Sequence, residues 1–116
     1  MNILIAGKTE EICDSIAQLL LELDCDNISI FTSGTIIRGV DISKFDSVII
    51  STPLSDEFGL DLVADIAKDT KNGVVVLAKR EIADEVQKKI RFTGAFVLPR
   101  PFNKALLVQT IKLAEV

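Results

Sequence analysis

Short apolar runs alternate along the chain with stretches whose apolar positions recur every three or four residues. The runs at 3–6 and 46–51 have the continuous apolar character of buried strands, and the second predicts a central strand covered on both faces. The run at 28–31 alternates apolar and polar residues, which predicts a strand at an edge or exposed on one face. The five expected strands span 3–6, 28–31, 46–51, 74–77 and 95–98.

The stretches between these runs predict five helices. Thr9 is expected to cap the first, because Glu10 and Glu11 follow it in the first turn, where carboxylates suit the helix dipole. The apolar stripe of this helix contains Ile12, Ile16, Leu19, Leu20 and Leu23. The remaining helices are expected at 34–43 (weaker, with Gly39 inside it), 60–67, 81–92 and 105–114. Asn72-Gly73 and Gly94 mark turns, and Leu106, Val108, Ile111 and Leu113 are the apolar residues of the last helix.

Five strands that alternate with five helices predict an α/β fold, with a parallel sheet covered on both faces and a single domain over 1–116. In such folds, ligands bind beyond the carboxyl ends of the strands. The residues at those ends are Ala6-Gly7, Thr32-Ser33, Ser51-Thr52, Ala78-Lys79 and Arg100-Pro101. The first, third and fifth ends carry no carboxylate.

Composition narrows the possible chemistry. The chain has no histidine, which removes Ser-His and Cys-His catalysis and histidine metal ligands. Its net charge of −4 argues against direct binding of nucleic acid. Cys13 and Cys25 are expected to be reduced thiols in a cytoplasmic protein, since no signal peptide or membrane-spanning run is present. No cofactor, metal or catalytic residue is expected.

Two segments carry a resemblance to a known family. The loop from Ser51 to Gly59 has the length and the final glycine of the loop after the third strand in receiver domains of two-component response regulators, the CheY-like family. Leu98-Pro99-Arg100-Pro101-Phe102 is similar to the Lys-Pro-Phe ending of the fifth receiver strand. The resemblance implies a doubly wound, flavodoxin-like (βα)₅ three-layer sandwich, with a five-stranded parallel sheet in the order 2-1-3-4-5.

Receivers accept a phosphoryl group on an aspartate that ends the third strand, beside an acidic pair that holds Mg²⁺, a Thr or Ser, and a Lys. The corresponding residues here are Ser51 for the aspartate, Ala6 and Gly7 for the acidic pair, Ala78 for the Thr or Ser, and Arg100 for the Lys. The resemblance therefore implies a degenerate pseudo-receiver that lacks the phosphoacceptor aspartate. It also implies a cis Arg100-Pro101 bond.

The neighbouring polar residues leave alternatives open. Ser51 is expected to satisfy backbone groups at the strand end, and Asp56 and Glu57 to lie in a solvated loop. Arg100 either holds an anion in the crevice or is an exposed charge. Lys8 either fills the space of the acidic pair or points into water.

Function is then expected on a surface. Receivers commonly dimerise or bind partners through the face of the fourth helix, fifth strand and fifth helix. Here that face would draw on Lys79, Arg80, Lys88, Lys89, Arg91, Phe96, Val97 and Lys104. The primary hypothesis is a non-phosphorylated receiver-like module of signalling or transcription control that binds a protein partner or forms a homodimer, with an output domain in any longer native chain.

Two alternatives remain: an atypical receiver switched by an anion or small ligand at Arg100, and a small flavodoxin-like enzyme. The enzyme is disfavoured, because no glycine-rich phosphate loop follows the first strand and no acid–base pair is clustered.

Overall fold

The apolar runs assemble into one parallel sheet in this computed structural model, which describes residues 1–21, 23, 27–70 and 73–114. The strand order is β2-β1-β3-β4-β5, and every neighbouring pair is parallel. The predicted fold class and strand order are therefore confirmed. The strands are β1 (Asn2–Ala6), β2 (Asn27–Phe31), β3 (Ser47–Ser51), β4 (Val74–Lys79) and β5 (Phe96–Arg100).

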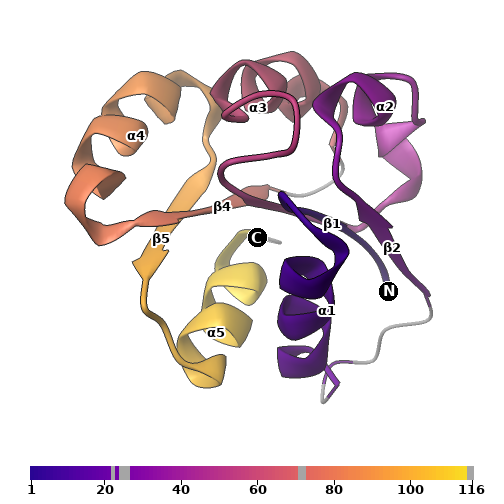
Figure 1. Cartoon of the computed structure of the whole chain (residues 1–116), viewed down its shortest axis with the longest axis horizontal. Coiled ribbons are helices and arrows are strands. Elements are labelled where there is room, and N and C mark those ends of the chain that lie inside the picture. The colour runs from indigo at the N-terminus through magenta and orange to yellow at the C-terminus, as the bar shows by residue number, and fades with distance from the viewer. Residues whose placement is uncertain (22, 24–26, 71–72, 115–116) are drawn as a thin grey trace.

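Helices cover both faces of the sheet. α1 and α5 lie on one face, and α2, α3 and α4 lie on the other (Figure 1). Short 3₁₀ turns extend several of these elements, at Ile42–Lys44, Ala67–Asp69, Arg80–Ile82 and Arg91–Thr93. The helices are α1 (Glu10–Leu19), α2 (Gly34–Arg38), α3 (Leu60–Ile66), α4 (Ala83–Ile90) and α5 (Lys104–Ala114).

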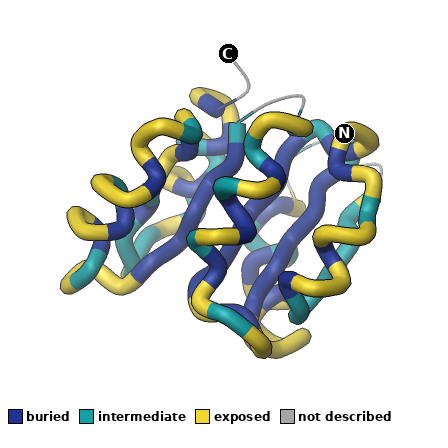
Figure 2. The backbone as a smooth tube through the Cα atoms, turned by 90° about the horizontal axis from the view of Figure 1, so that it is seen from above, coloured by how far each residue is buried: buried dark blue, intermediate teal, exposed yellow. Residues whose placement is uncertain are grey.

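The core consists of two apolar layers that share the strands. Ile3, Ile5 and Leu77 face α1 and α5, whereas Leu4 and Val76 face the opposite layer, as the alternation of side chains along a strand requires. Figure 2 shows the buried strands running between helices whose outer sides are exposed. β3 is buried along its whole length, and β2 is a half-exposed edge strand, so both predictions are confirmed.

The helices differ from expectation mainly at their ends and in their buried faces. α2 ends at Arg38, because Gly39 caps it through bonds from its N–H to the carbonyls of Ile36 and Ile37. The predicted continuation to 43 is therefore wrong. The 81–92 helix is likewise confined to α4, with a 3₁₀ turn on each side.

Of the four apolar residues that the sequence analysis named in the last helix, Ile111 is buried and Leu106 and Leu113 are exposed. In α5 the buried residues are Leu107, Ile111 and Ala114, whose spacing places them on one side of the helix. The exposed fractions of Leu106 and Leu113 are 45% and 53%, whereas Leu107, which the sequence analysis did not name, is fully buried.

The start of α1 agrees with the sequence. The Thr9 hydroxyl accepts a hydrogen bond from the Ile12 N–H, and Cys13 is a buried free thiol whose pKa is raised by burial and then by the nearby Asp14 and Glu10. Ile12 itself is more than a third exposed, contrary to its place in the predicted stripe. Cys25 and Asn72 lie outside the described residues. None of the described helices is long and apolar enough to cross a membrane.

Candidate functional site

The carboxyl ends of β1, β3 and β5 form the crevice where this fold places ligands. Ala6 ends β1 and is fully buried, and the Gly7 N–H bonds to the Phe31 carbonyl of β2. A Cβ built on Gly7 would lie 3.1 Å from the Cys13 Sγ and 3.2 Å from the Ile12 Cγ2. The first turns of α1 therefore occupy the space into which a side chain at position 7 would extend.

Ser51 and Arg100 meet across this crevice. The Arg100 Nη1 donates to the Ser51 Oγ over 2.9 Å, and its Nη2 donates to the Thr52 carbonyl over 2.7 Å. Only 2% of Ser51 is exposed, and the Thr52 hydroxyl donates in turn to the Leu77 carbonyl. The guanidinium thus fastens the end of β5 to the end of β3.

This geometry corrects two expectations. The partner of the Ser51 hydroxyl is a side chain and not the backbone, and Arg100 is half-buried, so its reading as an exposed charge is wrong. Burial lowers the pKa of Arg100, but a guanidinium remains charged at neutral pH. The Arg100-Pro101 bond is cis, as expected, and so is Thr52-Pro53, which the sequence reading did not foresee.

The remaining position of the receiver set carries no polar side chain. Ala78 is fully buried and packs into the layer that faces α2, α3 and α4. The neighbouring Lys79 is exposed at the end of β4.

Asp56 and Glu57 lie in the loop after β3, as expected, but this loop is also tied to α2. Asp56 accepts hydrogen bonds from the Ser33 and Thr35 hydroxyls and from the N–H groups of Gly34 and Thr35, over 2.7 to 3.3 Å. These bonds, of which the one from the Ser33 hydroxyl has the largest effect, hold the pKa of Asp56 well below its usual range. Asp56 thus acts as a cap for α2 supplied from a distant loop.

Glu57 forms a second tie between the same elements. Its carboxylate binds Arg38 of α2, whose Nε also contacts Asp65 of α3 over 2.8 Å. The Ser33-Gly34-Thr35 helix start was a visible signal for a capping acid, but the sequence could not say which carboxylate would reach it.

The residues expected on the α4–β5–α5 face do not all lie there. Lys88 and Arg91 are exposed, and Phe96 is 38% exposed on the edge strand β5. Val97 is half-buried and packs against the core beneath α4. The sequence reading missed Phe92, which is 77% exposed beyond the end of α4.

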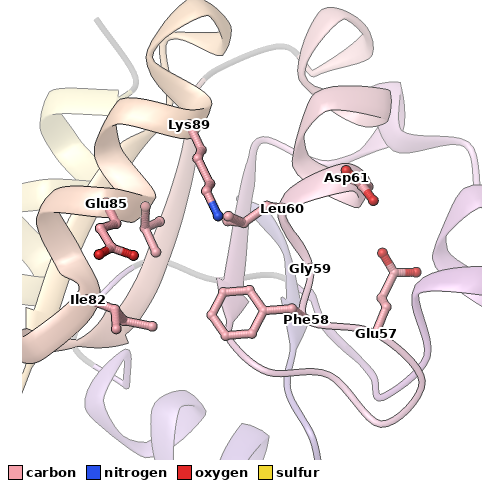
Figure 3. Close-up of a pocket in the computed structure, with 9 residues that line it drawn as sticks. Glu57, Phe58, Gly59, Leu60, Asp61, Ile82, Glu85 and Lys89 are labelled. Atoms are coloured by element: carbon pink, nitrogen blue, oxygen red, sulfur yellow. The ribbon is translucent and has the colours of Figure 1, made fainter.

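Lys89 belongs to a different surface. It extends from α4 toward Leu60 at the start of α3, in a groove of about 370 Å³ that Phe58 and Glu85 also line (Figure 3). Its placement on the dimerisation face is therefore not supported by the side-chain position. We define the α4–β5–α5 face by the residues Lys88, Arg91, Phe92, Phe96 and Lys104.

Similar solved structures share this architecture, although no protein-family model and no curated protein matches the sequence. The Vibrio cholerae chemotaxis protein CheY4 is 19% identical over 97% of both chains, with a TM-score of 0.78. The chain has the fold of receiver domains. A receiver domain of a sensor histidine kinase from Pseudomonas aeruginosa, solved with magnesium in its active site cleft, is 15% identical over 98% of this chain and 96% of that one, with a TM-score of 0.78.

One of the similar structures is that of an enzyme. An adenylate cyclase from Rhodopirellula baltica is 12% identical over 98% of this chain and 86% of that one, with a TM-score of 0.81. Identities this low relate the folds alone. What the present chain does must be argued from its own residues.

Proposed function

We propose that this chain is a receiver-like signalling module that binds a protein partner or a second copy of itself and does not transfer a phosphoryl group. The observation that carries the proposal is the Arg100 guanidinium on the Ser51 Oγ. A serine hydroxyl must lose its proton to attack phosphorus, and arginine has no acceptor for that proton. The partner of Ser51 therefore cannot act as its base.

The residues at the end of β1 do not fit a magnesium ion. Mg²⁺ binds proteins through oxygen ligands, and neither Ala6 nor Gly7 has a side-chain oxygen. A larger residue at position 7 would have to displace Cys13 or Ile12. Phosphoryl transfer depends on charge neutralisation by such an ion, so the crevice lacks both an aspartate acceptor and the carboxylates that would hold Mg²⁺ beside it.

The charge distribution supports a role in docking. Residues 79–104 contain seven of the 13 Lys and Arg but three of the 17 Asp and Glu, which gives this stretch a net charge of +4 in a chain of net charge −4. Three of these seven cations, Lys88, Arg91 and Lys104, belong to the α4–β5–α5 face as defined above. On the α4–β5–α5 face, the basic Lys88 and Arg91 accompany the exposed aromatic rings of Phe92 and Phe96. Exposed aromatic anchors beside charged residues are typical of protein interfaces. The proposed partner surface is acidic with apolar pockets, and a second copy would supply its own acidic regions.

Phosphoryl transfer is tested by intact mass. The chain is incubated with acetyl phosphate and Mg²⁺, next to an active receiver as positive control, and we expect no mass increase of one phosphoryl group. Ser51→Asp is included, because the proposal holds that an acceptor alone does not restore the site. A phosphoryl adduct on the natural chain would refute the proposal.

Docking is tested by light scattering over a concentration series. If a second copy is the partner, mass rises with concentration, and Phe96→Asp abolishes the rise. Phe58→Asp is the matched control, since Phe58 has a similar exposure of 41% but lies in the α3–α4 groove. A monomer at every concentration refutes the second copy and leaves an acidic protein partner. Equal loss in both variants refutes the assignment to this face.

A further inference from the structure

A cavity of about 550 Å³ opens beside the crevice, between α1 and the segment that joins β5 to α5. Its volume lies within the range of about 300–1,000 Å³ that is typical of small-molecule sites. The floor is formed by Ser51 and Leu77 of the central strands, and the cavity is open to solvent on its outer side. Neither the Ser51–Arg100 bond nor the α4–β5–α5 face explains it.

One end of the cavity is cationic. Arg100 and Lys79 line it together with a single carboxylate, Glu81, so the lining carries a net charge of +1. Arg100 uses one N–H on Ser51 and one on Thr52, which leaves three of its five donors. Among the residues that the structure describes, neither Arg100 nor Lys79 forms an ion pair. A half-buried guanidinium with free donors is a ready binding group for an oxyanion.

The rest of the wall is apolar. Ile12, Ile16 and Leu19 follow each other along α1, and Phe102 faces them from the β5–α5 segment. Ile12 is an exposed large aliphatic side chain in the first turn of its helix, where burial against a ligand would be favourable. An inorganic anion would leave this wall uncovered, and a neutral apolar molecule would leave the guanidinium unmatched.

We propose that this cavity binds a small organic monoanion, a carboxylate with an apolar body, whose head group meets Arg100 and Lys79 and whose body lies on α1. Glu81 selects against a dianion, because it leaves only one positive charge to match. The proposal deepens the proposed function and rests on it, since it requires that no phosphoryl chemistry uses the crevice at Ser51.

The probe is octanoate, titrated into the ¹⁵N-labelled full chain without Mg²⁺ or phosphodonor and followed by amide shifts. We expect saturable shifts at Ser15, Ser51, Lys79 and Arg100. Acetate, which lacks the body, inorganic phosphate, and 1-octanol, which lacks the charge, should each bind at least about tenfold more weakly, because each loses one half of the contact surface.

Three charge variants test the head group. Arg100→Gln should weaken octanoate binding about tenfold or more, and Lys79→Gln by about two- to fivefold, because its side chain is exposed. Glu81→Gln should strengthen binding by about two- to fivefold, since it removes the only repulsive charge in the lining. Lys112→Gln, on a part of α5 outside the cavity, is the matched control and should leave the affinity unchanged. If Arg100→Gln does not fold, the two exposed positions still decide the question.

The proposal is overturned if octanoate causes no saturable shift, if 1-octanol binds as tightly, or if Lys112→Gln changes the affinity as much as Lys79→Gln. Such a failure leaves the proposed function standing, provided that the mass of the chain is unchanged by acetyl phosphate. A phosphoryl adduct refutes the proposed function whether or not octanoate binds.

Discussion

Gly7, at the end of β1, has little space for a side chain because Ile12 and Cys13 of α1 lie against it, and this allows a quantitative prediction for Gly7→Ala. Gly7 does not have a positive φ, unlike Gly59 and Gly94, so alanine fits the backbone and gains about 0.4–1 kcal/mol by restricting the unfolded chain. Against this gain, the new Cβ meets the Cys13 Sγ at 3.1 Å and the Ile12 Cγ2 at 3.2 Å. Overpacking of a buried site costs about 1–3 kcal/mol. The cost exceeds the gain, and we expect a net destabilisation of about 1 kcal/mol.

Urea unfolding followed by circular dichroism measures this change, because the chain has no Trp or Tyr to report by fluorescence. Thermal unfolding should shift down by about 4 °C for a chain of this size. The Cys13→Ala background removes one of the two contacts, so the same substitution should cost at least about 0.5 kcal/mol less there.

Gly39→Ala is the matched control. Its Cβ would meet only the Ile36 carbonyl oxygen at 3.5 Å, an ordinary contact, so the restricted unfolded chain should dominate and stability should rise by about 0.4–1 kcal/mol. If Gly7→Ala also stabilises the chain, or costs the same with and without the Cys13 sulfur, the first turns of α1 do not close the site.

Three further substitutions test the packing and the polar contacts. Asp56→Asn should lower the melting temperature at neutral pH. Because the pKa of Asp56 is lower in the folded chain, its contribution to folding stability is fully present above the unfolded pKa of about 3.9. The difference in melting temperature from the natural chain should therefore shrink as the pH is lowered below that value. Leu107→Ala should cost about 2–5 kcal/mol in urea unfolding, whereas Leu106→Ala should cost less than about 1 kcal/mol, and equal costs would contradict the buried face of α5. Arg100→Gln should cost about 1–3 kcal/mol by leaving the Ser51 hydroxyl and the Thr52 carbonyl without their donor, and Arg100→Lys should recover only part of this, because an ammonium lacks the planar fork.

The fold could be predicted because its signals are local. The continuous apolar run of β3 predicts that it is buried on both faces, and the alternation of apolar and polar residues in β2 predicts an exposed edge strand. Thr9 predicts the start of α1. The sequence does not select the buried side of α5, since Leu106 and Leu113 share one side of the helix just as Leu107 and Ile111 share another. Only the tertiary position of α5 on β4 and β5 selects between the two sides.

The contacts between the β3–α3 loop and α2 could not be predicted from the sequence, for a different reason. Ser33 and Asp56 are separated by 23 residues, and Arg38 and Glu57 by 19. Each side chain alone fits a solvated loop or a helix surface. Their pairing depends on the path of the loop after Ser51, which no local pattern encodes.

The Ser51–Arg100 contact could be predicted in part from the sequence. The carboxyl ends of parallel strands meet at one edge, so the sequence already placed both residues there. However, β4 lies between β3 and β5, and two strand spacings amount to about 9–10 Å. The short side chain of a serine cannot span that gap, and most of the distance is covered by the long side chain of Arg100. The sequence left open whether Arg100 holds an anion or is an exposed charge, and it did not indicate a bond to Ser51. The bonds to Ser51 and Thr52 use two of the five guanidinium donors, so they leave three for the anion that we propose.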